Sequence, residues 1–168
     1  TASDAFPLET CETMNGSWGY NMTDNHYKSS KALIHYLINA AGRNTNFLLN
    51  VGPMPNGVIH PEFEDTLKLV GNWLNKYGET IYGTRGNVNE PQEWGMVTSK
   101  NKTIYVHMMN SVGKPYIFIP GFTAKVATAV SFDSKQKIKF KQQPEGLFIY
   151  TEGLPVNDVD SIIELTCK

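Results

Sequence analysis

The hydrophobic pattern of the chain changes its period near residue 85, and this change restricts the fold more strongly than any other feature of the sequence. Before it, apolar residues recur with the 3.6-residue period of helices, on either side of one short unbroken apolar run. After it, short strand-like runs alternate with turns that contain Gly and Pro. The change predicts an α/β unit over residues 1–85 and an antiparallel β-sandwich over residues 86–168.

The first predicted helix begins after Ser29 and Ser30, either of which can cap it. Apolar residues then recur along one face as far as Ala41. Gly42 follows, and we expect it to end the helix in a left-handed C-terminal cap. The apolar run over residues 46–51 is typical of a strand that is buried on both faces of a parallel sheet.

A second helix is predicted from Pro61 to Gly78, because proline suits the first helical position and glycine suits the end. Together these elements make about two β/α units, whereas a closed barrel of parallel strands needs eight units and roughly 250 residues. A two-stranded piece also leaves strand edges unpaired. We therefore expect residues 1–85 to be completed by polypeptide outside this sequence.

The second half contains short strand-like runs with turn residues between them, over residues 104–108, 116–119, 126–132, 138–141, 147–150 and 161–165. Lysines alternate with Ile138 and Phe140, as on a half-exposed strand, so they are interpreted as a solvated face and not as a polyanion site. His107 is expected on a strand face. Six to eight such strands predict a β-sandwich of roughly 80 residues.

Charge and cysteine content exclude several classes of function. A net charge of −1 gives no electrostatic basis for binding nucleic acid or a membrane surface, so neither is expected as a partner. Cys11 and Cys167 lie at opposite ends of the chain without CxxC spacing, which argues against a zinc site and against a disulfide scaffold. We expect each cysteine to be a small buried side chain.

Three sequence blocks resemble one enzyme family in their order and spacing. Residues 8–21, LETCETMNGSWGYN, resemble the W-E-x-C-x-T/S-x-x-x-S-W-G-Y-N stretch of glycoside hydrolase family 29, the α-L-fucosidases. Residues 46–53, NFLLNVGP, are similar to its G-N-x-L-L-N-V/I-G-P strand, and residues 71–83, GNWLNKYGETIYG, to its G-x-W-L-x-x-x-G-E-A-I-Y-G helix end. Leu8 stands where the family usually has Trp.

The resemblance implies that residues 1–85 are the C-terminal part of a catalytic (β/α)8 barrel and that residues 86–168 are the β-sandwich that follows it. It implies hydrolysis of terminal α-L-fucose from glycoconjugates with retention of configuration, without metal or cofactor. The family's aspartate nucleophile lies on an earlier barrel strand, so no residue here is assigned to that role. The expected partners are a fucosylated glycan and the missing N-terminal barrel segment, and the chain alone is expected to be inactive.

An alternative function is a non-catalytic carbohydrate-binding or structural β-sandwich module. It predicts exposed aromatic residues in the second half, such as Trp94 or Tyr116, that form a platform for sugar rings.

Retaining glycoside hydrolysis requires two carboxyl groups about 5–5.5 Å apart, one as nucleophile and one as acid/base. By resemblance, Glu9 occupies a position proposed as acid/base in some members of the family, while other members use a carboxylate just upstream of this segment. Glu9 also fits a second active-site carboxylate, or a structural Glu bonded to backbone amides. Glu12 is expected to be a solvated or supporting group.

Fucose is a 6-deoxy sugar, and the methyl group on its C5 requires an apolar wall in any binding site. The aromatic residue of the S-W/F-G-Y-N stretch resembles such a contact, which assigns this role to Trp18. The alternative is a tryptophan packed in the core. Asn50 and Asn56 follow the predicted barrel strand and are candidates for the mouth of the site, because barrel chemistry lies at the C-terminal ends of strands.

Overall fold

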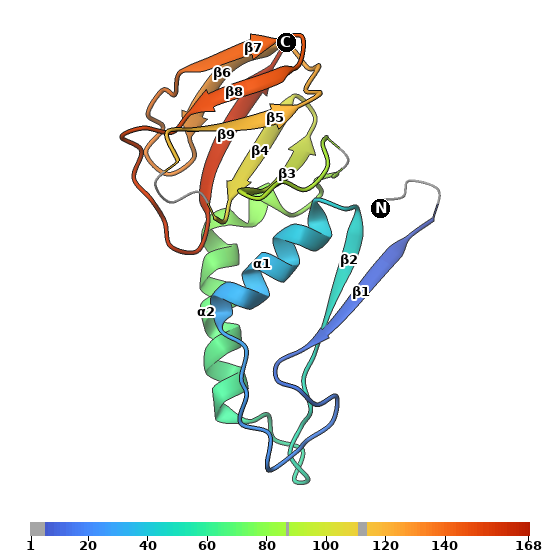
Figure 1. The fold of residues 1–168 in the computed structure, drawn as a ribbon. Coiled ribbons are helices and arrows are strands. Elements are labelled where there is room, and N and C mark those ends of the chain that lie inside the picture. The colour runs from blue at the N-terminus through green and yellow to red at the C-terminus, as the bar shows by residue number, and fades with distance from the viewer. Residues whose placement is uncertain (1–5, 87, 111–113) are drawn as a thin grey trace.

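The computed structural model describes residues 6–86, 88–110 and 114–168. They form two halves that lie end to end along the long axis of the molecule, as Figure 1 shows. We call residues 6–86 the α/β half and residues 88–168 the sandwich half. In the described residues, none of the helices combines the length and the apolar character that crossing a bilayer requires.

The α/β half consists of two parallel strands with two helices on one side of them. Strands β1 (Leu8–Thr13) and β2 (Thr45–Asn50) pair in parallel. Helix α1 (Ser30–Ala41) packs on β2, and helix α2 (Pro61–Tyr77) packs on α1 (Figure 1). A connection through a helix between two parallel strands is the β/α unit that the sequence predicts.

The ends of α1 confirm one prediction and correct another. Ser29 caps the helix by accepting a hydrogen bond from the Ala32 N–H at 3.2 Å. Gly42 is not left-handed, because its φ is −66°, and the left-handed residue is Asn44, with a φ of 54°. Glycine at position 42 leaves space for Met96: a Cβ there would overlap the Met96 Cε and lie 3.3 Å from its Cβ, where the helix meets the sandwich half.

Helix α2 starts at Pro61 as predicted and continues after Tyr77 into a short 3-10 turn, η1 (Gly78–Thr80). His60 is the residue before the helix, but its side chain makes no capping hydrogen bond. Gly78 has a right-handed φ of −58°, and a Cβ there would lie 2.7 Å from a ring carbon of Tyr82. The turn therefore folds the chain tightly back on the end of α2.

The sandwich half contains two antiparallel sheets. One has the order β3-β4-β9-β6, with bounds Gly95–Lys100, Thr103–Met108, Ser161–Cys167 and Val126–Ser131. The other has the order β5-β8-β7, with bounds Tyr116–Pro120, Gly146–Tyr150 and Phe140–Gln143. The six predicted runs correspond to β4 to β9, although β7 begins at Phe140 and not at Ile138. The predicted β-sandwich is confirmed.

Strand β3 was not predicted, and its burial explains why. Val97 points into the core between the two sheets, whereas Met96 points into a second core that the helices form with the outer face of the four-stranded sheet. Both faces of β3 are buried, so its sequence does not alternate between apolar and exposed polar residues. The second core joins the two halves and consists of Ile34, Ile38, Trp73, Tyr77, Ile81, Met96, Tyr105 and Ile162.

A buried hydrogen-bond chain also crosses the junction between the halves. His107 lies on β4 as predicted and is fully buried, with its Nδ1 2.7 Å from Asp160 Oδ2 and its Nε2 3.2 Å from Thr98 Oγ1. The Thr98 hydroxyl donates to the Thr80 carbonyl at 2.7 Å, which extends the hydrogen bonds into the α/β half. Since His107, Asp160 and Thr98 all have no exposed surface, these hydrogen bonds support the fold and cannot contact a substrate.

Candidate active site

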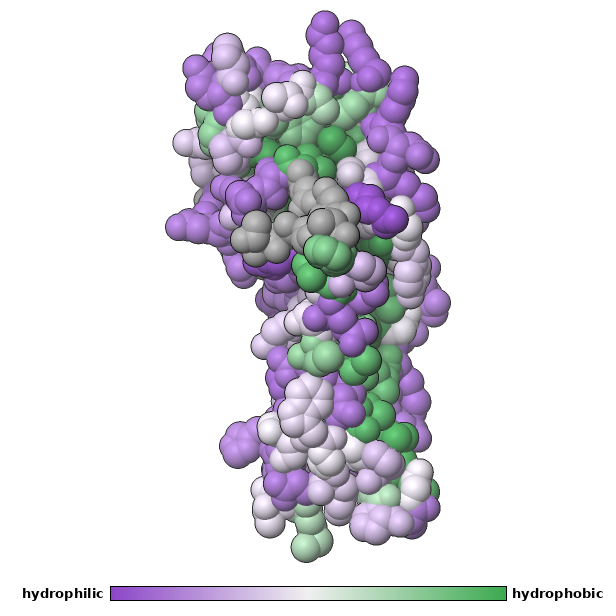
Figure 2. All heavy atoms as spheres, turned by 90° about the vertical axis from the view of Figure 1, so that its right-hand side faces the viewer, coloured by the Kyte–Doolittle hydropathy of each residue, from purple (hydrophilic) through white to green (hydrophobic). Residues whose placement is uncertain are grey.

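One face of the β1–β2 sheet is left open by the residues that the structure describes. On β2, Phe47 stacks on Tyr36 of α1 with 6.3 Å between ring centroids, and Leu49 packs in a small core under α1. Side chains alternate along a strand, so Leu48 points to the opposite face, where 44% of its surface is exposed. Figure 2, which views the molecule from the side of β1, shows exposed apolar residues along the lower half of this side.

The register of the sheet places Glu9 and Cys11 on this open face. Glu9 lies opposite Asn46 and Cys11 opposite Leu48, and both Glu9 and Cys11 are exposed. The Cys11 thiol lies 3.7 Å from Glu9 Oε1, and local desolvation together with this carboxylate raises the pKa of the thiol. The prediction that Cys11 is buried is wrong, whereas Cys167 is half-buried.

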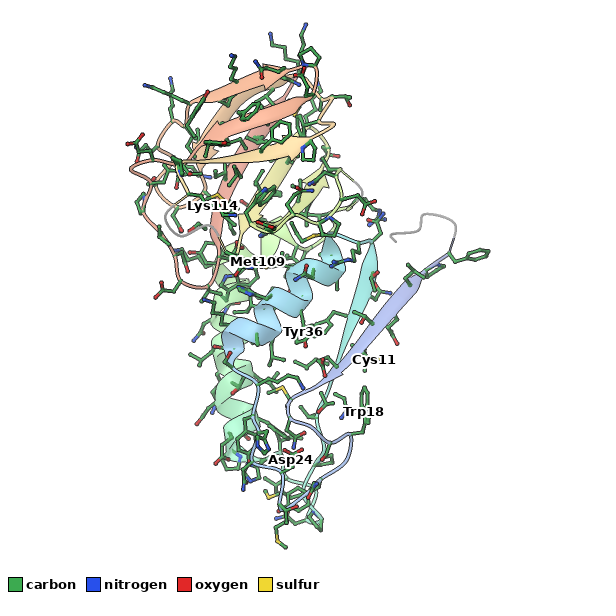
Figure 3. The ribbon with its side chains drawn as sticks, in the orientation of Figure 1. Cys11, Trp18, Asp24, Tyr36, Met109 and Lys114 are labelled. Carbon is green, nitrogen blue, oxygen red and sulfur yellow. The ribbon has the colours of Figure 1, made fainter. Side chains whose placement is uncertain are left out.

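Trp18 is exposed over 58% of its surface, so a tryptophan packed in the core is excluded. It lies on the loop after β1, and Figure 3 shows it beside Cys11 on the side of β1 away from α1. The loop is attached to the end of β2, because Asn50 Nδ2 donates to the Trp18 carbonyl at 2.6 Å. Gly52 makes this approach possible, since a Cβ there would lie 2.5 Å from the carbonyl carbon of Gly19.

Glu9 and Trp18 therefore share one side of the sheet but not one end of β1. Glu9 is the second residue of the strand, and Trp18 comes after its last residue, Thr13. Thr13 is four positions after Glu9 in an extended strand, which corresponds to about 13 Å at the usual rise per residue. Trp18 and Asn50 lie at the C-terminal ends of the strands, and Glu9 lies farther back along the open face.

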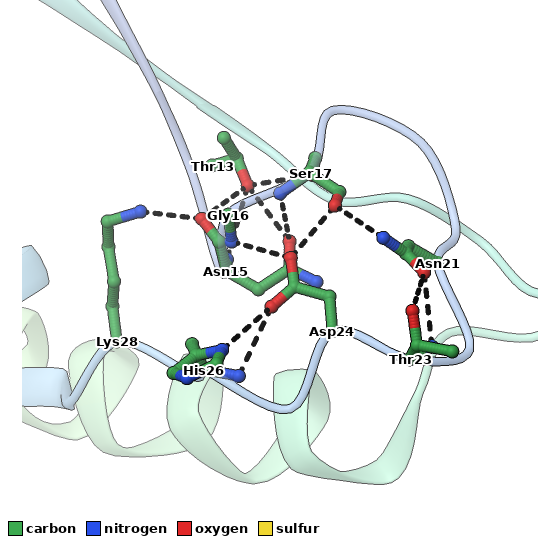
Figure 4. Close-up of polar contacts among 9 residues, drawn as sticks. All are labelled: Thr13, Asn15, Gly16, Ser17, Asn21, Thr23, Asp24, His26 and Lys28. Atoms are coloured by element: carbon green, nitrogen blue, oxygen red, sulfur yellow. Dashed lines mark hydrogen bonds and ion pairs between the residues drawn. The ribbon is translucent and has the colours of Figure 1, made fainter.

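A network of hydrogen bonds around Asp24 holds the loop that carries Trp18 (Figure 4). The Asp24 carboxylate accepts from the Ser17 hydroxyl at 2.8 Å and from the Gly16 N–H at 2.9 Å. The bond from Ser17, followed by one from the His26 N–H, lowers the pKa of Asp24. Sequence reasoning missed this residue, and the only available signal was the tendency of Asp to bond to the N–H two residues later.

Glu12 lies on the helix side of the sheet and is not part of the open face. Its carboxylate accepts from the Thr13 N–H at 2.8 Å and pairs with Lys28 Nζ at 3.1 Å. The Thr13 N–H and then Lys28 lower the pKa of Glu12. It is thus a supporting group, as expected. Asn56 accepts from the Val58 N–H within the loop after β2 and shapes that loop.

In the sandwich half, only one of the two suggested platform residues is exposed. Trp94 is buried in the core between the sheets, where its Nε1 donates to the Phe118 carbonyl at 3.1 Å, so the prediction of an exposed Trp94 is wrong. Tyr116 is exposed over 49% of its surface. Across the described ranges, no three His, Cys, Asp or Glu side chains come together as metal ligands.

The described residues thus combine an open strand face that carries Glu9, an exposed tryptophan on the loop after the strand and an adjoining β-sandwich. Comparisons with known proteins then indicate the family. Residues 1–79 match the family model described as alpha-L-fucosidase. The chain is 35% identical over 99 residues to tissue alpha-L-fucosidase of Mus musculus, an alignment that covers 57% of this chain and 20% of that protein.

Longer alignments give the same family. Tissue alpha-L-fucosidase of Homo sapiens is 28% identical over 170 residues, which covers 95% of this chain and 36% of the human protein. Among solved structures, alpha-L-fucosidase isoenzyme 1 from Paenibacillus thiaminolyticus superposes with a TM-score of 0.84 at 31% identity and covers 96% of this chain and 40% of that chain. Thermotoga maritima alpha-fucosidase in complex with fucose gives a TM-score of 0.82 at 26% identity, with the same coverage.

The chain is thus similar in sequence and fold to the C-terminal part of the α-L-fucosidases of glycoside hydrolase family 29. It spans between 20% and 40% of the length of the relatives named above.

Proposed function

We propose that this chain is the C-terminal part of a retaining α-L-fucosidase. Residues 1–85 would complete a catalytic (β/α)8 barrel, and residues 86–168 would form the β-sandwich domain beside it. The observation that carries this proposal is the open face of the β1–β2 sheet. In a barrel, every strand turns one face toward the helices and the other toward the interior, and β1 and β2 have this division.

The sheet edges support the same proposal. A two-stranded sheet has one unpaired edge on each strand, and further parallel strands would satisfy these backbone groups. Apolar side chains such as Leu48 and Phe6, which are exposed in this chain, would then be covered. The nucleophile would come from the polypeptide that supplies those strands.

In this enzyme, Trp18 would form the wall against the methyl group of fucose, and Glu9 would act as the acid/base. The nucleophilic carboxylate attacks the anomeric carbon while Glu9 protonates the departing oxygen. Glu9 then removes a proton from the water that hydrolyses the glycosyl–enzyme intermediate. Glu9 is the carboxylate that the described residues place on the open face, and this position supports its assignment.

The first test compares hydrolysis of an aryl α-L-fucoside by the purified chain and by a longer protein that carries a family 29 N-terminal region. We expect turnover only from the longer protein, because the chain alone has no route to the covalent intermediate. Robust turnover by the chain alone would contradict the proposal.

A second test addresses Glu9 in the longer protein. Replacing a general acid/base lowers the rate by about 10²- to 10⁴-fold, so Glu9→Ala should do so with a poor leaving group. External azide should restore turnover and give a fucosyl azide, because a small anion can replace the activated water. Glu12→Ala is the matched control. A Glu9→Ala variant with full activity, or with a loss that azide does not relieve, would reject the acid/base role.

A further inference from the structure

The outer face of the β5-β8-β7 sheet carries two rows of side chains, one that ends just before β7 and one that crosses all three strands. In the first row, Tyr116 lies opposite Tyr150, whose N–H bonds to the Lys139 carbonyl at 3.0 Å. In the second row, Phe148 lies between Phe118 and Lys141. We call these residues the aromatic–lysine face: Tyr116, Phe118, Lys139, Lys141, Phe148 and Tyr150.

These side chains point away from the sandwich core. The residues that alternate with them on β5 and β8 are fully buried between the sheets: Ile117, Ile119, Leu147 and Ile149. Tyr116 and Tyr150 retain 49% and 42% of their surface, and both lysines are exposed. The outer face of the other sheet is covered by α1 and α2, whereas this one faces solvent.

The rings at the centre of the face lie low over the sheet. Phe118 and Phe148 pack with 4.5 Å between ring centroids, and Tyr116 adjoins Phe148 at 5.8 Å. The Phe118 ring covers Gly146, since a Cβ at that position would lie 2.9 Å from two of its ring carbons. One side of this ring therefore rests on the backbone of β8, and the other side is turned outward.

The lysines of this face are available to a ligand. In the part of the chain that the structure describes, neither Lys139 nor Lys141 forms an ion pair, whereas Lys135 binds Glu164 at 2.7 Å and Lys114 binds Glu93 at 3.5 Å. Cross-strand aromatic pairs alone stabilise a sheet, but they do not require exposed Tyr hydroxyls or unpaired cations beside them. The combination indicates a binding surface that is apolar in its centre and positive along one side.

We propose that the aromatic–lysine face binds a glycan that carries an anionic group, a carboxylate or a sulfate. The C–H side of a pyranose ring would pack on the aromatic rings, and the anion would contact the ammonium groups of Lys139 and Lys141. A hollow of about 640 Å³ adjoins the β5 edge and is lined by Gln92 and Tyr116 and by the ion pair of Lys114 with Glu93, so it offers hydrogen-bonding groups but no free cation. The face lies in the sandwich half, at the end of the molecule opposite the Trp18 loop (Figures 1 and 3).

The test is a titration of the chain with three probes: an oligosaccharide that ends in a carboxylate-bearing sugar, the same oligosaccharide without that sugar, and free fucose. Binding is followed by protein NMR shifts of the aromatic region. We expect saturable binding of the acidic probe, with weaker binding of the neutral one. Tyr116→Ala and Tyr150→Ala should each weaken binding about tenfold. Lys139→Ser with Lys141→Ser should remove the preference for the acidic probe, which is about two- to fivefold for exposed charges.

Tyr82→Ala and Lys68→Ser are matched controls, because both residues are exposed in the α/β half. Circular dichroism establishes that each variant is folded. Absence of saturable binding to either oligosaccharide, or binding that the Tyr116 and Tyr150 variants leave unchanged, would overturn the proposal. Equal binding of both oligosaccharides would overturn the role of the lysines. None of these outcomes affects the fucosidase proposal, because hydrolysis is measured at the other end of the molecule.

Discussion

The two-stranded sheet of the α/β half and the four-stranded sheet of the sandwich half differ in how completely their faces are covered by other parts of the molecule. Most of the four-stranded sheet is covered on both faces, by the second sheet on one side and by the helices on the other. The β1–β2 sheet is covered on one face only, and an exposed leucine remains on the other. We therefore expect the stability of the chain to be concentrated at the junction and in the sandwich half.

The largest expected effect on the free energy of unfolding comes from the buried hydrogen bonds of His107 at the junction. His107→Ala leaves Asp160 buried without its partner, and breaking a buried pair in this way costs about 3–5 kcal/mol of unfolding free energy. Urea denaturation followed by circular dichroism measures the change. Lys135→Ala, which removes an exposed pair with Glu164, is the control and should cost about 0–1 kcal/mol. Equal costs for the two variants would show that the junction is not the stable region.

Substitutions at two glycines should change the free energy of unfolding by intermediate amounts and in opposite directions. Gly42→Ala forces a Cβ into Met96, and overpacking of this kind destabilises by about 1–3 kcal/mol. Gly71 lies within α2 with open space around it, so Gly71→Ala should stabilise by about 0.5–1 kcal/mol through helix propensity. The same urea titrations measure both. A Gly42→Ala variant as stable as the parent chain would mean that the terminal methyl group of Met96 moves aside without cost.

The loop at the open face should respond to pH through Asp24. Its pKa is lowered in the folded state, so its contribution to stability is present above the unfolded pKa and is lost as the pH falls through the folded pKa. Asp24→Asn should therefore lower stability at neutral pH and make no difference at strongly acid pH. Unfolding titrations of both proteins from pH 7 downward measure this. If the difference in stability between the two proteins stayed constant with pH, ionisation of the Asp24 carboxylate would not be its cause.

The smallest effect on stability is expected at Trp18. Its side chain is largely exposed, so Trp18→Ala should change the unfolding free energy by less than about 0.5 kcal/mol. In the longer fucosidase, the same change should raise KM for the aryl fucoside, because an apolar wall of the sugar site is lost. A large loss of stability would instead make Trp18 a packing residue.

Sequence reasoning reached the features that local patterns control. The two helices, the Ser29 cap, Pro61 and six of the seven strands described in the sandwich half follow from periodicity and turn residues. It failed where the structure depends on contacts between segments that are far apart in the sequence. Strand β3 lacks alternation because residues from both halves cover it, and Trp94 is buried because the other sheet packs on it. The partner of His107 is 53 residues away. The exposure of Cys11 depends on which face of the sheet is left open.

The core that α1 and α2 share with β3, β4 and β9 has a practical consequence for dissecting the molecule. A cut after residue 85 would strip Met96, Tyr105 and Ile162 from one fragment and expose Ile34, Ile38 and Trp73 on the other. Each fragment would expose an apolar surface to water and would tend to precipitate or to reassociate with the other. Proteolysis under native conditions should therefore not release a durable C-terminal fragment at this position, and co-expressed pieces should recombine into one particle.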